Sequence, residues 1–436
     1  MTARMGSRPA KGAKLSLAEA AQLVRPRDVL TCGLAVAQPT GLLEAIGARD
    51  DFEDLAILSG LLIRPYAFFQ RRGVRVLSGF YGPVERMAQA AGATVDYVPA
   101  DFTGLERLVR QLAPRIVAAV TTPPDADGWM SFGLHAGAHF TPFLEAARDP
   151  ERLAIAEANP QIPRIGGLPE LGGHRVHVSE VDAWVEHDET PVSLPAAVPS
   201  PEEIAIAEHA TALVEDGATL QLGIGGIPDH IAKILASGAK GDFGIHTEMI
   251  ADGAMHLHRA GKVTNRKGLY DGLSVGTFAI GSPELYRWLD GNPQVAMLPV
   301  SATNDPALCR RLRRFVSVNG ALMVDLAGQV AADHIGARQY SGVGGHETFV
   351  MAARAAPGGR SLVCLRSTVT VGGERVSTIV PHIPSDATVT TPRHQTHWVV
   401  TEHGAVDLTA RTQRERAEAL ISIAHPDFRD ALRAAR

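Results

Sequence analysis

The segment Ala218-Thr-Leu-Gln-Leu-Gly-Ile-Gly-Gly-Ile-Pro228 joins a short apolar strand pattern to a glycine-rich turn and a proline that begins a helix pattern. Glycines between a strand and a helix allow backbone N–H groups to approach a phosphate. The dinucleotide fingerprint G-x-G-x-x-G would need a glycine where Pro228 stands, which disfavours a Rossmann site. A tight strand-to-helix turn is the simpler interpretation of this stretch alone.

A similar pattern occurs near the N-terminus. Asp28-Val-Leu-Thr-Cys-Gly33 predicts a buried strand that leads through small residues to Pro39 and a helix. Further strand patterns, with helix patterns between several of them, lie at 55–62, 74–80, 94–98 and 116–122. This alternation predicts an α/β fold with a largely parallel sheet that is covered on both faces.

A composition change marks a boundary in the middle of the chain. Four prolines fall within Pro191–Pro201, which excludes a regular helix or a central strand there. Ser200 is a good N-cap for the helix pattern that follows. We therefore expect two related open α/β domains, at 1–190 and 201–436, joined by a proline-rich linker at 191–200.

Composition and charge restrict the function classes. The 436 residues are 45% hydrophobic and 20% charged, with a formal net charge of −5. This balance argues against a dedicated nucleic-acid binder, and no apolar run reaches the roughly 18 residues that cross a membrane. The basic segment 1–14 is not followed by an apolar stretch, so we expect no signal peptide and a cytoplasmic protein.

No metal-binding motif is found. The three cysteines, Cys32, Cys309 and Cys364, lie far apart, which disfavours a disulfide framework or a cysteine zinc site. The close histidine pairs at 256/258 and 394/397 match no zinc motif. We expect no bound metal.

Two other stretches could carry chemistry. Gly244-Ile-His-Thr-Glu-Met249 is a strand pattern that ends at Glu248, before a helix pattern over 249–259. Sites form at the carboxyl ends of strands in open α/β sheets, where a carboxylate can act as nucleophile or base. Ser341-Gly-Val-Gly-Gly-His-Glu347 is a second glycine loop before a helix pattern over 348–355. The alternatives are a solvated glutamate and a flexible turn.

Together, in this order and spacing, these stretches resemble the acetyl-CoA hydrolase/transferase family of class I CoA-transferases, which includes acetate, butyrate and 4-hydroxybutyrate CoA-transferases. The resemblance is dense from about residue 200 onward and looser before it. Further matching stretches are Asn159–Arg164, Val324–Gln329, Arg366–Thr368, Val389–Thr391, Val399–Gly404 and Ile423–Arg429.

The resemblance implies two α/β domains of the CoA-transferase type with the active site between them. It implies that Glu248 is the nucleophile and that Gly345 donates a backbone N–H to the thioester oxygen. It also implies no permanently bound cofactor, since the coenzyme A thioester is a substrate. The residues that it implies for acyl-CoA binding are Gly223, Ile224, Gly225, Gly226, Ile227, Asn319, Gly344 and Gly345.

The expected function is transfer of CoA between an acyl-CoA and a small carboxylic acid through a glutamyl-CoA thioester on Glu248. An acyl-CoA hydrolase, in which water resolves the same thioester, is one alternative. A non-catalytic protein that binds a nucleotide or CoA is another. The expected partners are these substrates and further copies of the chain, as a dimer or higher oligomer, without nucleic acid or membrane.

The sequence departs from the family in three places. The usual Gly-Gly-Gln loop with a later Asp-Phe is Gly344-Gly-His-Glu-Thr-Phe349, a frequent lysine is Thr370, and a usual Ser-Arg pair is Ser377-Thr378. We hypothesise that His346, which can gain charge between pH 5 and 8, lies beside the acyl or acceptor pocket and selects the carboxylate. A protonated His346, or Arg164, would suit a dicarboxylic acid. The alternative is that His346 only replaces the glutamine sterically within the helix packing.

Overall fold

The computed structural model describes residues 8–195 and 198–436, which form two compact units. The first contains residues 8–194 and Gly276–Ala302, and the second contains the rest. Residues 1–7 of the basic N-terminal segment and 196–197 of the predicted linker lie outside the described residues. None of the helices described is long and apolar enough to span a membrane.

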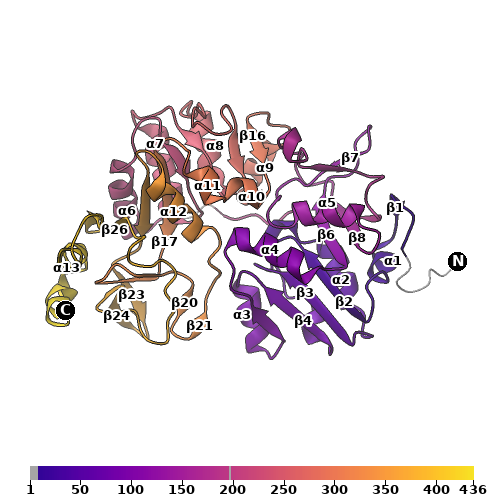
Figure 1. The fold of residues 1–436 in the computed structure, drawn as a ribbon, viewed down its shortest axis with the longest axis horizontal. Helices are drawn as coiled ribbons and strands as arrows, with labels where there is room; N and C mark the ends of the chain where they lie inside the picture. Colours follow the sequence, from indigo (N-terminus) through magenta and orange to yellow (C-terminus); the bar gives the residue numbers. More distant parts are fainter. Residues whose placement is uncertain (1–7, 196–197) are drawn as a thin grey trace. The chain divides into compact units, whose positions relative to one another are not determined.

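The first unit is built on an eight-stranded sheet in the order β1-β10-β8-β6-β2-β3-β4-β5, and every pairing is parallel (Figure 1). Its central strands β6 and β8 are buried at every position, as expected of a sheet covered on both faces. The predicted alternation is therefore confirmed. The strands are β1 (Ala13–Lys14), β2 (Arg27–Cys32), β3 (Asp54–Ser59), β4 (Val74–Ser78), β5 (Val95–Tyr97), β6 (Ile116–Thr121), β8 (Leu153–Ala158) and β10 (Ala183–Glu186).

Helices and a small hairpin connect these strands. Helix α1 begins with the capping box that Ser16 and Glu19 form, and Pro39 precedes α2 as its pattern predicts. The elements are α1 (Leu17–Ala21), α2 (Thr40–Gly47), α3 (Pro83–Ala90), α4 (Phe102–Leu112), α5 (Phe140–Arg148) and the paired strands β7 (Trp129–Ser131) and β9 (Arg175–His177).

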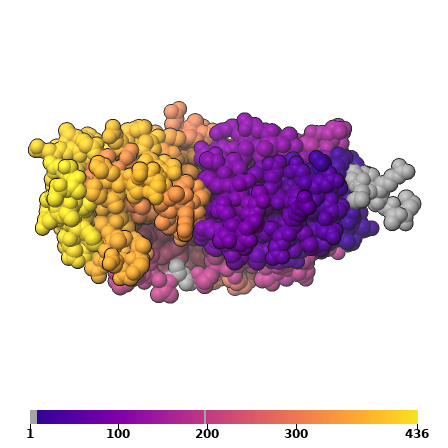
Figure 2. All heavy atoms as spheres, turned by 90° about the horizontal axis from the view of Figure 1, so that it is seen from below, coloured from indigo at the N-terminus to yellow at the C-terminus, as the bar shows by residue number. Residues whose placement is uncertain are grey.

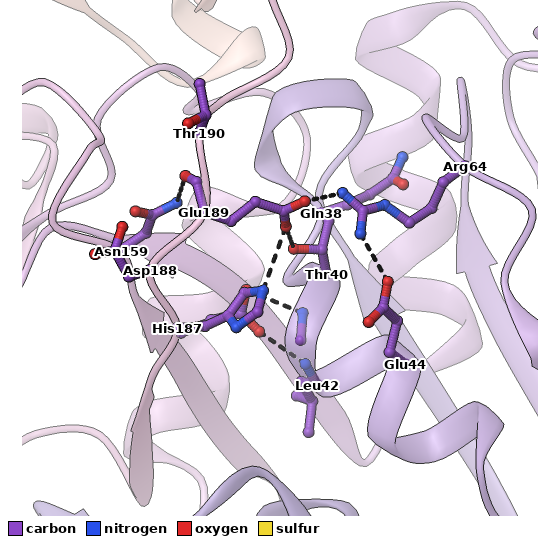
Figure 3. A network of polar contacts seen from close by, with 12 residues as sticks. Gln38, Thr40, Leu42, Glu44, Arg64, Asn159, His187, Asp188, Glu189 and Thr190 are labelled. Atoms are coloured by element: carbon purple, nitrogen blue, oxygen red, sulfur yellow. Dashed lines mark hydrogen bonds and ion pairs between the residues drawn. The ribbon is translucent and has the colours of Figure 1, made fainter.

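A polar network at the carboxyl ends of β8 and β10 holds α2 in place (Figure 3). The carboxylate of Glu157 in β8 accepts the backbone N–H groups of Gly41 and Leu42, at 3.3 and 2.8 Å. Glu189 pairs with Arg64, and Arg64 donates to Glu44 in α2 at 2.7 Å. The two bonds to Glu157 satisfy N–H groups at the start of α2 that lack partners within the helix.

Residues 276–302 pack with the first unit, although the predicted second domain includes them. Backbone N–H groups of Ala136 and Gly137 donate to the Thr277 oxygen at 2.7 and 3.1 Å, and Ala279 donates to Leu134 at 2.7 Å. No change in composition marks this crossing in the sequence. The segment carries β15 (Phe278–Ala279), α9 (Pro283–Leu289) and β16 (Val295–Met297), between the crossing elements β14 (Ser274–Gly276) and α10 (Val300–Thr303).

The second unit contains a six-stranded sheet in the order β12-β11-β17-β22-β26-β27. All pairings are parallel except the last, between β26 and β27. The strands are β11 (Thr219–Gln221), β12 (Gly244–Ile245), β17 (Phe315–Gly320), β22 (Arg360–Cys364), β26 (Trp398–Thr401) and β27 (Gly404–Asp407).

Helices connect the strands of the second unit. Helix α6 begins at Pro201 with the predicted cap: Ser200 and Glu203 form a capping box. The C-terminal helix α14 lies on the surface of the unit (Figure 2, yellow). The helices are α6 (Pro201–Ala212), α7 (Gly226–Ser237), α8 (Asp252–Arg259), α11 (Pro306–Cys309), α12 (His346–Ala355), α13 (Gln413–Ser422) and α14 (Arg429–Ala434). Short strands form outside the main sheet: β13 (Met249–Ile250), β18 (Met323–Asp325), β19 (Val330–Ala331), β20 (His334–Ile335), β21 (Arg338–Gln339), β23 (Thr368–Val371), β24 (Glu374–Ser377) and β25 (Ile379–Val380).

Candidate active site

Glu248 follows the edge strand β12 of the second sheet, as the sequence predicts. The chain stays extended beyond β12, because His246 forms a β-bridge with Val275 and the Thr247 hydroxyl donates to the Leu222 oxygen at 2.9 Å. The second bond ties the Glu248 segment to the turn between β11 and α7. The predicted helix start at Met249 is wrong by three residues, because Met249–Ile250 forms strand β13 and α8 begins at Asp252.

Two hydrogen-bond donors hold the half-buried Glu248 carboxylate. The side-chain amide of Asn304 donates to Glu248 Oε2 at 2.7 Å, and the backbone N–H of Gly345 also donates to the carboxylate. Burial raises the pKa of Glu248 to about 7, and the two hydrogen bonds oppose this shift because they favour the ionised form. The result is a carboxylate that is poised to gain or lose its proton near neutral pH.

The chain at Gly345 passes too close to Glu248 for any side chain. A Cβ atom at this position would lie 2.1 Å from Glu248 Oε2 and 2.6 Å from Asn304 Nδ2, well inside van der Waals contact. The preceding residue, Gly344, has a φ of +56°, a conformation that favours glycine. The two glycines are therefore required for different reasons, one by close approach and one by backbone conformation.

The first glycine loop has open space around two of its glycines. Gly223 and Gly225 lie between β11 and α7, and a Cβ on either would meet no atom within 4 Å. Ile224 between them is 46% exposed. Gly226 and Ile227 begin α7, and a Cβ on Gly226 would lie 2.5 Å from a carboxylate oxygen of Glu203. The predicted tight turn is thus present, with exposed backbone beside the Glu248 segment.

Asn319 lies in β17 and is not among the groups that contact Glu248. Its side chain is half-buried, and its Nδ2 atom is buried without a hydrogen-bond partner among the described residues. A buried donor without a partner is costly unless a ligand or water satisfies it. The unpartnered Nδ2 of Asn319 fits the role in acyl-CoA binding that the family resemblance implies for this residue.

The side chain of His346 is bonded within the protein. Its Nε2 lies 3.0 Å from the Thr391 hydroxyl, which donates to Glu347 Oε2 at 2.6 Å. Burial lowers the pKa of His346 to about 4, so the ring is neutral between pH 5 and 8. Burial therefore disfavours the charge that the hypothesis needs in that range, and the place of His346 beside the acyl or acceptor pocket stays a prediction. Arg164 is also engaged, with Asp125 at 3.3 Å.

We predict that His346→Gln leaves the pH dependence of acceptor choice unchanged. A neutral ring cannot favour a dicarboxylate by charge. The ratio of the kcat/KM values for succinate and acetate should therefore change by the same factor between pH 6 and pH 8 in the wild type and in His346→Gln. The ratio itself changes only if the ring contributes by its shape. A ratio that falls from pH 6 to pH 8 in the wild type alone would restore the imidazolium hypothesis.

Sequence reasoning missed Asn304. Its signal is weak, because Asn304 is a single polar residue after the apolar run 295–300, 56 positions from Glu248. No spacing or periodicity joins two residues that far apart. Only the fold brings the amide to the carboxylate.

Comparison with known proteins identifies the family. Residues 281–436 match the model of the acetyl-CoA hydrolase/transferase C-terminal domain. A succinyl-CoA:cyclohexane-1-carboxylate CoA transferase of Geobacter metallireducens is 37% identical over 419 residues, which cover 95% of this chain and 92% of that protein. This chain belongs to the acetyl-CoA hydrolase/transferase family. It is an enzyme of the CoA-transferase class.

Solved structures of similar proteins agree with this assignment to the acetyl-CoA hydrolase/transferase family. RipA from Yersinia pestis is 34% identical, with a TM-score of 0.87 over 97% of this chain and 96% of that one. A 4-hydroxybutyrate CoA-transferase from Porphyromonas gingivalis is 30% identical, with a TM-score of 0.78 and the same coverage of both chains. The CoA-transferase type of α/β fold that the sequence predicts is therefore confirmed.

Proposed function

We propose that this member of the acetyl-CoA hydrolase/transferase family transfers CoA from an acyl-CoA to a free carboxylic acid, with Glu248 as the nucleophile. The observation that carries the proposal is the Glu248 carboxylate between the Asn304 amide and the Gly345 N–H, with its pKa raised by burial. Partial removal of water from a carboxylate and fixed orientation both favour nucleophilic attack.

In the proposed reaction, acyl groups move between carboxylate oxygen atoms and the sulfur atom of CoA. The Glu248 carboxylate attacks the thioester carbonyl, the C–S bond breaks, and an acyl-glutamyl anhydride and CoA thiolate form. The thiolate then attacks the Glu248 carbonyl carbon, which releases the first acid and leaves a glutamyl-CoA thioester. A second carboxylate reverses these steps. Covalent catalysis in this way divides one difficult exchange into easier ones.

The hydrogen bonds assign different tasks to the two carboxylate oxygens. Asn304 holds Glu248 Oε2, and a Cβ on Gly345 would also lie nearest to that oxygen, so Oε1 is the freer atom for attack. When the thiolate attacks the glutamyl carbon, Oε2 becomes the oxyanion and already has its donors. An oxyanion donor of this kind contributes about 3–4 kcal/mol to transition-state stabilisation.

We predict that kcat/KM for the acyl-CoA falls as the pH drops through about 7. A nucleophilic carboxylate must be ionised, and the pKa of Glu248 lies near 7, so activity is present above that pH and lost below it. Initial rates at subsaturating acyl-CoA from pH 5 to 9 measure this fall in kcat/KM, which is the acid limb of the pH profile. A limb centred below pH 5 would show that burial does not control the ionisation of Glu248.

Intact mass spectrometry tests the proposed function directly. The protein is incubated with acetyl-, butyryl-, succinyl- or 4-hydroxybutyryl-CoA, and its intact mass is examined for an added CoA. Proteolytic digestion then shows which peptide carries the added mass. An adduct on Glu248 supports the covalent route, whereas the absence of any adduct favours a non-catalytic CoA-binding protein.

Product analysis distinguishes transfer from hydrolysis. Acetate, succinate, 4-hydroxybutyrate or cyclohexane-1-carboxylate is added to each acyl-CoA. A transferase forms the new acyl-CoA with ping-pong kinetics, which give parallel double-reciprocal lines. Release of free CoA alone, at a rate that no acid changes, would assign the protein as a hydrolase.

A further inference from the structure

A group of buried side chains that the proposed reaction does not use lies beside the Glu248 segment. His246, Lys267 and Cys309 are each 0% exposed. The ring of His246 is parallel to that of Tyr270, with centroids 6.3 Å apart, and meets Phe315 edge-on at 6.4 Å. Burial lowers the pKa of His246 to about 3, with a smaller effect from Lys267, so the imidazole is neutral at any pH that suits an assay.

The imidazole Nε2 of His246 makes its short hydrogen bond to a backbone carbonyl and also lies 3.5 Å from the Cys309 sulfur. The His246 Nε2 lies 2.8 Å from the Thr303 oxygen, and since a carbonyl only accepts, Nε2 carries the hydrogen. The Cys309 thiol is a second, weaker donor to the same oxygen, at 3.0 Å. The His246 Nδ1 is buried and has no partner among the described residues.

The carbonyl that His246 holds belongs to the peptide that leads into Asn304. Asn304 is itself 0% exposed, and its Nδ2 donates to Glu248 at 2.7 Å, but its Oδ1 has no partner in the described part of the chain. No hydrogen bond to Oδ1 from the described residues therefore orients the Asn304 side chain. Because the peptide bond is planar, a hydrogen bond on the Thr303 oxygen also fixes the Asn304 nitrogen, and so the origin of the side chain.

We propose that His246 is a positioning residue for the nucleophile: by fixing the Thr303–Asn304 peptide, it aims the Asn304 amide at Glu248. The Cys309 thiol supports the same position as the second donor to the Thr303 oxygen. The inference rests on the proposed function, since it concerns how the nucleophile of that reaction is held. It gives a task to a neutral, buried histidine that does not contact the reacting atoms.

The test compares His246→Leu, which removes the donor, with His246→Gln, which keeps an amide N–H near the position of Nε2. We expect His246→Leu to lower kcat by about 10- to 100-fold with little change in KM, because displacement of a reacting group by about 1 Å costs that order of rate. We expect His246→Gln to recover most of the loss.

The acid limb of kcat/KM supplies a readout that a purely structural role would not move. The Asn304 bond favours ionised Glu248, so a misaimed amide should raise the pKa and shift the limb upward by about one pH unit in His246→Leu. The titratable groups packed against His246 are Lys267, Cys309 and Tyr270, and burial lowers the pKa of Lys267 to about 7. Both variants keep all three groups, so a difference between them reports on the bond to Thr303.

The chain offers a matched control in the first unit. His174 is 1% exposed, its Nε2 lies 2.9 Å from the Gly133 oxygen, and its Nδ1 also lacks a partner among the described residues. His174→Leu therefore removes the same kind of bond at a site without any bond to the Thr303–Asn304 peptide. We expect it to lower Tm at least as much as His246→Leu, because the φ of +56° at His174 adds backbone strain to the substitution, and to leave kcat and the acid limb at their wild-type values.

The possible outcomes separate the inference from the proposed function. A wild type without a CoA adduct on Glu248 would overturn the function itself. If the wild type forms the adduct, and His246→Leu has a lower Tm but the wild-type kcat and acid limb, then His246 is structural and the inference fails. If His246→Leu does not fold, His246→Asn, which is too short to reach Thr303, takes its place against His246→Gln. Loss of the fold in all three variants would also assign His246 to stability.

Discussion

Glu248→Gln and Glu248→Ala are expected to lower kcat by at least about 10⁴-fold and to abolish the CoA adduct, while the protein stays folded. Removal of a covalent nucleophile eliminates the covalent reaction pathway instead of slowing one of its steps, and losses of kcat of this order are typical. The amide of Glu248→Gln is nearly the same size and still offers an oxygen to Asn304 Nδ2. It also removes a carboxylate that is costly to bury, so Tm should not fall.

The control for this prediction is Glu157→Gln in the first unit. Burial also raises the pKa of Glu157, and its carboxylate accepts two backbone N–H groups at the start of α2. The same substitution there should leave kcat within about 3-fold of the wild type. Turnover, intact mass and Tm are measured for both variants. An adduct that persists in Glu248→Gln, or maps to one of the three buried cysteines, would contradict the assignment of the nucleophile.

The sequence was sufficient where local pattern decides structure. The apolar runs and glycine turns predict strands β2 and β11 and the helices that follow them, since each depends on residues that are neighbours in the chain. The same kind of pattern makes Glu248 a candidate, as a carboxylate that follows a strand, but its role as nucleophile rests on the family resemblance. The glycines beside it were predicted from the family resemblance, and the structure supplies the steric reason for Gly345.

The sequence was insufficient where distant segments meet. Residues 276–302 join the first unit through hydrogen bonds to residues 134–137, and no local pattern encodes that pairing. Asn304 reaches Glu248 for the same kind of reason. The charge of His346 depends on its burial against Thr391 and its neighbours, which lowers the pKa to about 4, and burial of a single polar residue has no local signature.

Gly345→Ala is expected to lower kcat by about 10²- to 10³-fold without unfolding the protein. The backbone there has a φ of −90° and a ψ of 4°, which alanine adopts readily, so the added methyl group creates no backbone strain. Its Cβ would instead lie 2.1 Å from Glu248 Oε2, 2.6 Å from Asn304 Nδ2 and 2.8 Å from a ring carbon of Phe349. The end of the Glu248 side chain is the most mobile of these groups, so the carboxylate moves.

The displaced carboxylate should lose its alignment and its donors together. A shift of about 1 Å at a reacting group costs about 10²-fold in rate, and loss of the donors raises the pKa of Glu248, which moves the acid limb above pH 7. Gly166→Ala is the matched control, because a Cβ there meets no atom within 4 Å and its φ is not positive. Single-turnover adduct formation and the pH profile measure both effects. If Gly345→Ala forms the adduct at the wild-type rate with an unmoved acid limb, the Glu248 carboxylate does not react from the position in which Asn304 and Gly345 hold it, and the nucleophile must act from another rotamer.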